Sequence, residues 1–541
     1  MLMKDVICPQ GEIVKDFLQK KGYGIFDCGG RGTCGKCKAQ VLEGNAGELT
    51  EIEKKILTSK ELSEQIRLLC QIQAVTDVKI SIKYIKKKEE GISFSAKMPV
   101  IDNQKQEKKQ KEISVAESFG VAFDIGTTTV VGRLFDLTTK QMIKEMTAWN
   151  PQQCFGADVI TRMQYCLKSN GKFNGRKEMQ RQIADCLDKM LEFFMEVESR
   201  TDNQKEKERK VEKELEIKKE SELEKEIKID KIVVAGNSAM THFFLEQNID
   251  SLAKAPFCPL FTKGQERKGK ECHLKNAENA AVFTLPLLEG QIGGDITAGL
   301  LSIDIFSKPE NTMFVDIGTN GEIAFFRNGK IYLCSTAAGP ALEGAGISCG
   351  MRASLGAIEC IWLSGGEVYT KVIGNTMAQG ICGSALIDAI AVFLDLGKIE
   401  KSGYLDSGSI ILTKPEREDI KISITQEDIR QYQMVKGAIR AGMEVLMNTA
   451  NAKLEEIEHI YIAGSFGSNI RKQNAMKTGL LPKISPEKIT MIGNASLQGA
   501  SMVLLSEKSK QYAETIREKT VFVNLAEKKE FQELYIKYLD F

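Results

Sequence analysis

The stretch "CGGRGTCGKC", residues 28–37, places three cysteines and four glycines in ten positions, and a further cysteine follows at Cys70. The full spacing is Cys28-x5-Cys34-x2-Cys37-x32-Cys70. Three thiolates on a glycine-rich loop plus one distant thiolate are typical of a [2Fe–2S] cluster, because glycines let the backbone curl around the inorganic core. Zinc is the alternative, but zinc sites usually pair two C-x-x-C knuckles, and only one is present here. The spacing therefore predicts an iron–sulfur site with all four cysteines as ligands.

Residues 1–85, which contain this loop, have the pattern of a compact β-rich module. Alternating apolar residues predict strands near 2–8 and 38–42, a closing strand at "VTDVKISIKYI" and a short helix around 13–19. The cysteine spacing and the "RLLCQ" around Cys70 resemble the [2Fe–2S] ferredoxin family, and the five-residue gap is nearer the adrenodoxin variety than the plant type. The resemblance implies a β-grasp ferredoxin-type α+β domain that carries one electron at low potential.

Composition divides the rest of the chain. Residues 86–118 are rich in Lys and Glu without apolar periodicity, which predicts a flexible charged linker rather than a nucleic-acid patch. Residues 119–541 regain a globular composition, except for 203–230, whose charges predict an exposed helical insert with an apolar seam too thin for a coiled coil. A net charge of +1, with no signal peptide and no run of ~18 apolar residues, predicts a cytoplasmic protein without nucleic-acid or membrane partners.

Two motifs repeat in the same order along residues 119–541. "FDIGTTTVVGRLFD" at 123–136 is echoed by "VDIGTNGEIAFFR" at 315–327, and "IVVAGNSAM" at 232–240 by "IYIAGSFGS" at 460–468. Each DIGT has a strand–turn–strand pattern, and each AG follows a buried strand, so both halves are predicted to be α/β. The backbone N–H groups and hydroxyls of such turns can hold phosphate oxygens, and the aspartate can hold Mg²⁺.

These motifs resemble the superfamily of acetate and sugar kinases, heat-shock chaperones and actin. The resemblance implies a duplicated α/β (actin-like, ribonuclease H-like) ATPase domain whose lobes, about 119–305 and 306–541, hinge around ATP and Mg²⁺. Asp124 and Asp316 would be catalytic carboxylates. The cofactor-binding residues would be Gly126, Thr127, Thr128 and Thr129 in phosphate-1, Gly318, Thr319 and Asn320 in phosphate-2, and Gly464, Ser465, Phe466 and Gly467 in the adenosine loop.

Two further segments each have two interpretations. Asp295, in "GQIGGDITAGLL", either caps the helix that follows or acts as a third catalytic carboxylate that positions water or Mg²⁺. The glycine-rich segment 335–354, "STAAGPALEGAGISCGMRAS", is either a flexible surface loop or an edge where a cofactor or partner docks, with Glu343 as its only acid. We favour docking for this segment.

A low-potential cluster and an ATPase on one chain predict ATP-assisted electron transfer. "DIGTT", "GGDI", "DIGTNGE" and "AGPALEG" resemble the ATPase domain of reductive activators of corrinoid-dependent methyltransferases. The resemblance implies an enzyme that passes an electron from an external low-potential donor through its cluster to a corrinoid protein, returning Co(II) to Co(I), and it implies a homodimer. Some members carry a middle domain before the ATPase region. Residues 86–118 are too few for a domain, so we expect it to be missing here.

Three other functions fit parts of the sequence. An activase of 2-hydroxyacyl-CoA dehydratases belongs to the same ATPase superfamily, but its cluster is a [4Fe–4S] centre that bridges two subunits. A small-molecule kinase with a regulatory iron–sulfur module needs a substrate base that the sequence does not place. A chaperone-like binding module gives the cluster no purpose. The resemblance to the reductive activators spans nearly the whole chain, so theirs is the function we predict.

Overall fold

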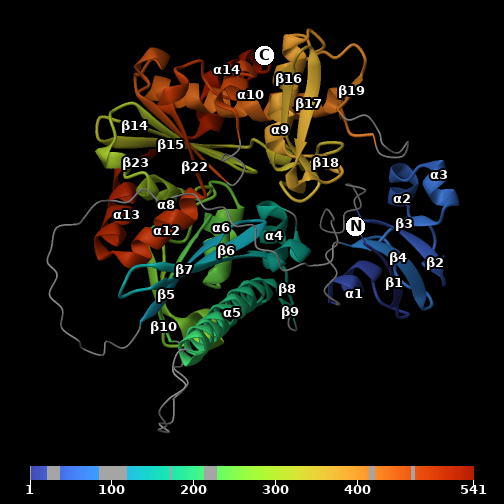
Figure 1. Ribbon diagram of the computed structural model, residues 1–541, viewed down its shortest axis with the longest axis horizontal. Coiled ribbons are helices and arrows are strands. Elements are labelled where there is room, and N and C mark those ends of the chain that lie inside the picture. Colours follow the sequence, from blue (N-terminus) through green and yellow to red (C-terminus); the bar gives the residue numbers. More distant parts are fainter. Residues whose placement is uncertain are drawn as a thin grey trace, which may run out of the picture.

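The computed structural model describes residues 2–20, 37–84, 118–156, 158–170, 173–211, 228–412, 421–464 and 470–541. Among the predicted features, the ligands Cys28 and Cys34, the linker 86–117 and the adenosine-loop residues Ser465, Phe466 and Gly467 lie outside the described residues. Figure 1 shows a small N-terminal sheet domain in blue and a larger part that is built on two sheets.

The N-terminal domain is a four-stranded sheet in the order β1-β4-β2-β3. Its first and last strands pair antiparallel, with Cys8 opposite Val78, and Gly11 makes the turn after β1 with φ of +86°. Cys8, Val14 and Leu18 are fully buried in its core. The predicted β-grasp arrangement is therefore present, with elements β1 Leu2–Cys8, α1 Val14–Lys20, β2 Lys38–Glu43, α2 Glu51–Ile56, α3 Ser59–Ser63, β3 Ile66–Leu68 and β4 Val78–Tyr84.

The first lobe of the larger part is a six-stranded sheet in the order β11-β12-β10-β5-β6-β7. β5 pairs antiparallel with β6 and parallel with β10. One face of the sheet is covered by α5 and α6, whose apolar side chains form a single buried cluster with β5 and β10. The elements of this lobe are β5 Phe119–Ile125, β6 Thr129–Asp136, β7 Met142–Trp149, α4 Val159–Cys166, β8 Ser169–Asn170, β9 Phe173–Asn174, α5 Gly175–Val211, β10 Ile229–Gly236, α6 Ser238–Phe244, α7 Asp250–Ala253, β11 Gln265–Lys268, β12 Ala281–Thr284 and α8 Gly294–Ser302.

The second lobe repeats this plan with the sheet β22-β21-β13-β14-β15-β23. The run β22-β21-β13-β14-β15 matches β12-β10-β5-β6-β7, and Asp316 stands opposite Ala463 as Asp124 stands opposite Ala235. The duplication predicted from the repeats is thus present in the strand order. The elements are β13 Thr312–Ile317, β14 Gly321–Arg327, β15 Lys330–Thr336, β16 Ala357–Ser364, β17 Glu367–Val372, β18 Gly380–Ile381, α9 Gly383–Asp395, β19 Ser409–Ile411, β20 Ser423–Thr425, α10 Gln426–Thr449, β21 His459–Ala463, α11 Lys472–Lys477, β22 Ile489–Gly493, α12 Ala495–Leu505, α13 Glu507–Lys519, β23 Thr520–Phe522 and α14 Lys529–Lys537.

Two helices, α8 and α12, lie between the sheets of the two lobes (Figure 1). They share one apolar cluster with strands of both lobes. The helices pack backbone to backbone, because a Cβ on Gly499 of α12 would lie 2.0 Å from the carbonyl oxygen of Ala298 on α8. On its other side α8 contacts the second lobe, where a Cβ on Gly299 would lie 2.5 Å from the ring of Phe314. Both N-termini thereby reach the ends of β5 and β13, where the DIGT turns lie.

The charged insert is helical where it is described, since α5 continues to Val211, and residues 212–227 lie outside the described residues. Its predicted end at residue 230 is wrong by two residues. Ile229 and Asp230 belong to β10, where Ile229 is buried and Asp230 accepts a hydrogen bond of 2.6 Å from Ser118 Oγ. Among the helices that the structure describes, none combines the length and apolar composition that crossing a membrane requires.

Candidate functional site: a cysteine pair and two facing phosphate turns

The two described cysteines of the predicted cluster site lie side by side. Cys37 immediately precedes β2 and Cys70 follows β3, and the backbone N–H of Leu69 donates to the carbonyl oxygen of Cys37 at 2.9 Å. Their Sγ atoms are 3.3 Å apart. Two thiolates on one tetrahedral metal, with metal–sulfur bonds of about 2.3 Å, lie roughly 3.7 Å apart, so this pair fits two ligands of the same iron. The separation supports Cys37 and Cys70 as neighbouring ligands of a [2Fe–2S] cluster.

A buried ion pair fixes the strand that leads to Cys70. The guanidinium of Arg67 on β3 donates to both carboxylate oxygens of Glu53 at 2.8 and 2.9 Å, and the backbone N–H of Leu68 also donates to Glu53. Burial by itself would raise the pKa of Glu53, but these bonds and one from the N–H of Thr50 outweigh it and lower the pKa. The charge of Glu53 thus stays in place beside the strand that leads to Cys70.

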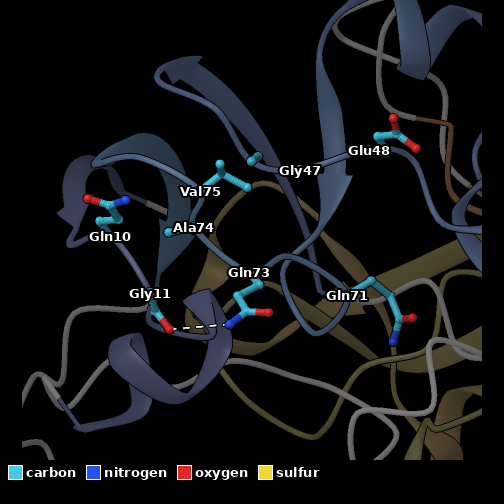
Figure 2. Close-up of a pocket in the computed structure, with 9 residues that line it drawn as sticks. Gln10, Gly11, Gly47, Glu48, Gln71, Gln73, Ala74 and Val75 are labelled. Carbon is cyan, nitrogen blue, oxygen red and sulfur yellow. Dashed lines mark hydrogen bonds between the residues drawn. The ribbon is translucent and has the colours of Figure 1, made fainter.

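Beside Cys70, the side-chain amide of Gln71 donates to the Cys70 Sγ atom at 3.5 Å. Gln71 also lines a pocket on the ferredoxin domain, shown in Figure 2 together with the bond of 3.5 Å from Gln73 to the carbonyl oxygen of Gly11. None of the residues that line this pocket belongs to the phosphate turns: they are Gln10, Gly11, Ala46, Gly47, Glu48, Gln71, Gln73, Ala74 and Val75. Of the residues that line the pocket, Gln71 is the one that donates to a predicted cluster ligand.

The first predicted phosphate turn, hairpin 1 (residues 124–131), joins β5 to β6. Gly126 is required at its corner, because a Cβ there would lie 2.9 Å from the carbonyl oxygen of Thr129. The turn's carbonyl groups are held from behind by three side chains. Asn150 donates to Gly126, Gln153 to Thr128 and the fully buried Arg162 to Thr127, at 2.8, 2.6 and 2.5 Å. With these carbonyls occupied, and with the N–H of Gly126 bonded to the carbonyl oxygen of Thr129 at 2.9 Å, the threonines of the turn supply the groups that can face an anion.

The carboxylate of Asp124, at the end of β5, is bonded by groups from the far end of the sequence. Asn494 Nδ2 donates to one oxygen at 2.9 Å and Ser496 Oγ to the other at 2.8 Å. Asn494 caps α12, so the positive end of that helix also points toward Asp124. Burial raises the pKa of Asp124, while the two donors and Arg133 lower it. Asp124 therefore ties the N-terminus of α12 to the first lobe.

The second predicted turn, hairpin 2 (residues 316–322), is shorter by one residue and brings two acids together. Asp316 on β13 stands directly opposite Glu322 on β14, and residues opposite each other in an antiparallel pair share a face. The hydroxyl of Thr319 donates to Glu343 at 2.9 Å, and the N–H of Gly339 donates to the carbonyl oxygen of Thr319 at 2.8 Å. Glu343, predicted to lie on a docking edge, thus contacts the turn; docking by the remainder of 335–354 stays a prediction.

Asp295 belongs to the same region, but it does not cap α8. The N-cap position is Gly293, and Asp295 is the second residue of the helix, where its Oδ1 accepts from its neighbour Ile296 at 2.9 Å. The interpretation as a cap is therefore wrong. The carboxylate instead faces Asp124 and Asp316, whose charges interact with it.

Together these side chains form an acidic cluster of Asp124, Asp295, Asp316, Glu322 and Glu343, each partly exposed. Burial and the charge of Asp124 raise the pKa of Asp295 to about 7. Burial and the charges of Asp295, Asp124 and Glu343 likewise raise the pKa of Asp316 to about 7, and burial with Asp295 and Asp316 raises that of Glu322. Crowded carboxylates of this kind gain from a divalent cation, which would favour their charged forms.

The acidic cluster suits Mg²⁺ that is shared with phosphate. Among the described residues, no three His, Cys, Asp or Glu side chains form a group that could hold a metal ion by themselves. Mg²⁺ usually keeps several waters and completes its shell with one or two carboxylates and phosphate oxygens. The N-termini of α8 and α12 at the cluster, and the threonines of the two turns, suit phosphate. The residues present therefore fit ATP with Mg²⁺.

The predicted adenosine loop is described only at its first residue. Gly464 has φ of +100°, and a Cβ there would lie 2.7 Å from the carbonyl oxygen of Ile317 and 3.0 Å from Oδ1 of Asp316. The strand end at Gly464 is thus pressed against hairpin 2. Glycine is needed here for both the backbone angle and the contact.

Comparison with known proteins gives matches along nearly the whole chain. The 2Fe-2S iron-sulfur cluster binding domain matches residues 4–75, the RACo middle region 119–211 and 208–308, and the C-terminal domain of RACo, the ASKHA domain, 310–541. These matches confirm the predicted fold class, a ferredoxin-type domain followed by an actin-like ATPase, and with it the [2Fe–2S] cluster and ATP as cofactors. Fold and site together define the chain as an iron–sulfur ATPase.

Proteins that are similar to the chain over most of its length identify the family within this class. The chain is 34% identical over 459 residues to the corrinoid activation enzyme RamQ of Eubacterium limosum, across 81% of this chain and 72% of that protein. It is 27% identical over 425 residues to the [Co(II) methylated amine-specific corrinoid protein] reductase of Methanosarcina barkeri, across 72% and 71%. A solved structure of a reductive activator for corrinoid, iron-sulfur protein matches with a TM-score of 0.67 and 26% identity, over 99% and 96% of the two chains. The chain belongs to the family of reductive activators of corrinoid proteins.

One expectation about this family is wrong. The middle region is present, because its model matches from the start of β5 at residue 119 to residue 308, just beyond α8. The number of residues between the two modules did not reveal the middle region, because this region forms the first lobe of the actin-like fold. It is not a separate domain ahead of that fold.

Proposed function

We propose that this chain reactivates a corrinoid protein of a methyltransferase system by reducing inactive Co(II) to Co(I) in an ATP-dependent step. The observation that carries the proposal is the combination, on one chain of this family, of a cysteine pair that suits a cluster and an acidic cluster that suits Mg²⁺ and ATP. One electron enters from an external low-potential donor and leaves to the cobalt of the partner. ATP cleavage supplies the driving force without joining the electron path.

A [2Fe–2S] cluster bound by Cys28, Cys34, Cys37 and Cys70 supplies one-electron transfer at low potential. The protein residues around it hold the ligands in place: Arg67 and Glu53 brace the strand before Cys70, and Gln71 donates a hydrogen bond to a ligand sulfur. Hydrogen bonds of this kind raise the potential of a cluster, because they stabilise added negative charge. The ferredoxin domain is thus the entry point for the electron.

The roles of the ATP-site residues follow from their contacts. Hairpin 1, whose carbonyls are occupied, offers the N–H groups and hydroxyls of Thr127, Thr128 and Thr129 to phosphate. Asp316, with Asp295 beside it, holds Mg²⁺ directly or through water. Asp124 keeps α12 against the first lobe and would add a carboxylate near the same cation. Gly318 and Asn320 complete the second phosphate turn, and Gly464 begins the adenosine loop with Ser465, Phe466 and Gly467.

ATP can drive the uphill reduction only if it binds two conformations of the complex with different affinity. The two lobes supply such conformations, because α8 packed on α12, the helix pair between the two sheets, lies at the phosphate turns. We assign the ATPase lobes as the docking surface for the corrinoid protein and the ferredoxin domain as the docking surface for the external donor. We assign the protein to the cytoplasm. A homodimer completes the proposal.

The direct test mixes the reduced protein with a purified Co(II) corrinoid protein from a methyltransferase system and follows the cobalt absorbance with and without MgATP. Co(I) should form only with ATP. Cys70→Ser should remove the cluster signal and spare ATP binding, whereas Cys258→Ser, an exposed cysteine outside the ligand set, should change neither. A panel of corrinoid partners that yields no ATP-dependent Co(I) would contradict the proposal, and a bridged four-iron cluster would favour the dehydratase activase.

A further inference from the structure

Arg352 has the one buried side-chain nitrogen or oxygen, within the described part of the chain, that lacks a hydrogen-bond partner: its Nη1. The residue lies between the short helix at Pro340–Glu343 and β16, in the glycine-rich segment 335–354. Leaving a buried donor of a charged group without a partner is unfavourable. An unsatisfied guanidinium nitrogen beside a nucleotide site indicates a ligand with an acceptor oxygen.

The neighbours of Arg352 contact both phosphate turns. Its guanidinium carbon lies 4.8 Å above the ring of Trp149, which is the last residue of β7 and stands opposite Thr129 of hairpin 1. The charge of Arg352 also interacts with that of Glu343, which accepts the hydrogen bond from Thr319 of hairpin 2. Arg352 therefore spans the two lobes at the two segments that would hold the phosphates.

The charges around Arg352 indicate the kind of ligand that it binds. The acidic cluster holds five carboxylates, and Arg133, the cation that acts on Asp124, already pairs with Glu145 at 2.6 Å. Burial lowers the pKa of Arg352 and Glu343 raises it, but a guanidinium remains charged in either case. Bound ATP brings several negative charges to this region. Arg352 is a cation with an open donor at the edge of the site.

We propose that Arg352 binds the terminal phosphate of ATP and gives up its contact with Trp149 when it does so. This inference rests on the proposed function for its nucleotide, and deepens it by naming the residue that distinguishes ATP from ADP. A guanidinium presents its donors in a planar fork that matches phosphate oxygens. Because Arg352 belongs to segment 335–354, occupation by the terminal phosphate moves the segment expected to dock a partner, and release of phosphate returns it.

The test uses the chain's two tryptophans. In the full-length Trp362→Phe protein, Trp149 becomes the only indole, and a guanidinium leaving its ring changes its fluorescence. We expect Mg²⁺ with AMP-PNP to change the emission of Trp149 and MgADP to leave it unchanged. Arg352→Ala should abolish the response and weaken MgAMP-PNP binding about 10- to 100-fold, with MgADP affinity within about twofold. Arg352→Lys, which keeps the charge without the fork, should recover part of the affinity.

The matched control is Arg471→Ala, because Arg471 also lies over a tryptophan, Trp362, at 5.8 Å but contacts neither phosphate turn. It should leave both affinities unchanged. Retained MgADP affinity shows that the Arg352 variants are folded. If Arg352→Ala keeps the wild-type ratio of the two affinities while wild type binds ATP and forms Co(I), this inference alone is overturned. If wild type binds neither nucleotide, the proposed function fails as well.

Discussion

Hairpin 1 and hairpin 2 begin with the same four residues, DIGT, yet their surroundings differ sharply. The backbone of hairpin 1 is held by Asn150, Gln153 and Arg162, and both oxygens of Asp124 accept hydrogen bonds from α12. Hairpin 2 has a shorter turn, sets Glu322 against Asp316 and places Glu343 on Thr319. The first is a braced turn with a hydrogen-bonded carboxylate; the second is a crowded set of carboxylates.

The repeated motif by itself suggests that both hairpins do the same work. Their different surroundings indicate two tasks, one for each hairpin. A braced turn suits a fixed cradle for phosphate, since little rearrangement is needed when the anion binds. A set of acids with raised pKa values suits a cation that arrives with the nucleotide. We therefore expect changes at hairpin 1 to act mainly on stability and changes at hairpin 2 mainly on MgATP.

The largest expected effect is at Arg162, which is fully buried and donates to the carbonyl oxygens of Thr127 and Gly156. Arg162→Met should lower the free energy of unfolding of the ATPase lobes by about 3 kcal/mol, because two carbonyls lose their donor inside the protein. Urea unfolding measures this. Arg181→Met, which removes an exposed arginine paired with Glu178, should cost less than about 0.5 kcal/mol. Equal losses in the two variants would show that hairpin 1 is not braced.

The second prediction concerns the cation. Asp316→Asn should weaken MgATP binding about 100-fold, because it removes a charge that meets Mg²⁺ and leaves the fold intact. Calorimetric titration with MgAMP-PNP measures the affinity. The control is Asp136→Asn, at the end of β6 away from hairpin 1. It should change the affinity for MgAMP-PNP by less than about twofold. A wild-type affinity in Asp316→Asn would place the cation elsewhere and remove the proposed difference between the hairpins.

A smaller effect is expected where hairpin 1 meets α12. Ser496→Ala removes one donor to Asp124 and should lower the free energy of unfolding by about 1 kcal/mol. The measured pKa of Asp124, followed by NMR of the labelled carboxyl carbon, should rise further. Ser501→Ala is the control, since its hydroxyl bonds only to Leu497 on the same helix. If both serines prove equally costly, the contact with Asp124 adds nothing.

The sequence predicted most of this arrangement but not the pairings that give each hairpin its character. The repeats were sufficient for the duplicated lobes, Asp124 and Asp316, because both aspartates end a strand before a glycine turn. Glu322 was missed, although it lies in "DIGTNGE", because its position opposite Asp316 depends on the turn length and hence on the strand register. Asn494 and Ser496 were missed because they reach Asp124 only through the packing of α12 on the first lobe.

The smallest predicted effect is on pH dependence. The folded-state pKa of Asp316 is raised from 3.8 to about 7, so the metal-free folded protein binds more protons than the unfolded chain between these values. Its contribution to stability therefore falls as pH rises from about 4 to 7 and levels off above 7. Relative to wild type, metal-free Asp316→Asn should lose that slope, a difference in Tm on the order of 2 °C between pH 5 and 7. Identical slopes would mean that Asp316 is not crowded by its neighbours.

The central claim is that the acids of hairpin 2, through the MgATP that they bind, control an electron transfer that takes place at another part of the chain. The most direct test is a single-turnover experiment with reduced Asp316→Asn protein, a Co(II) corrinoid protein and MgATP. We predict a wild-type [2Fe–2S] signal before mixing and no Co(I) afterwards, whereas reduced wild-type protein forms Co(I) under the same conditions. Formation of Co(I) by Asp316→Asn at the wild-type rate would contradict the account.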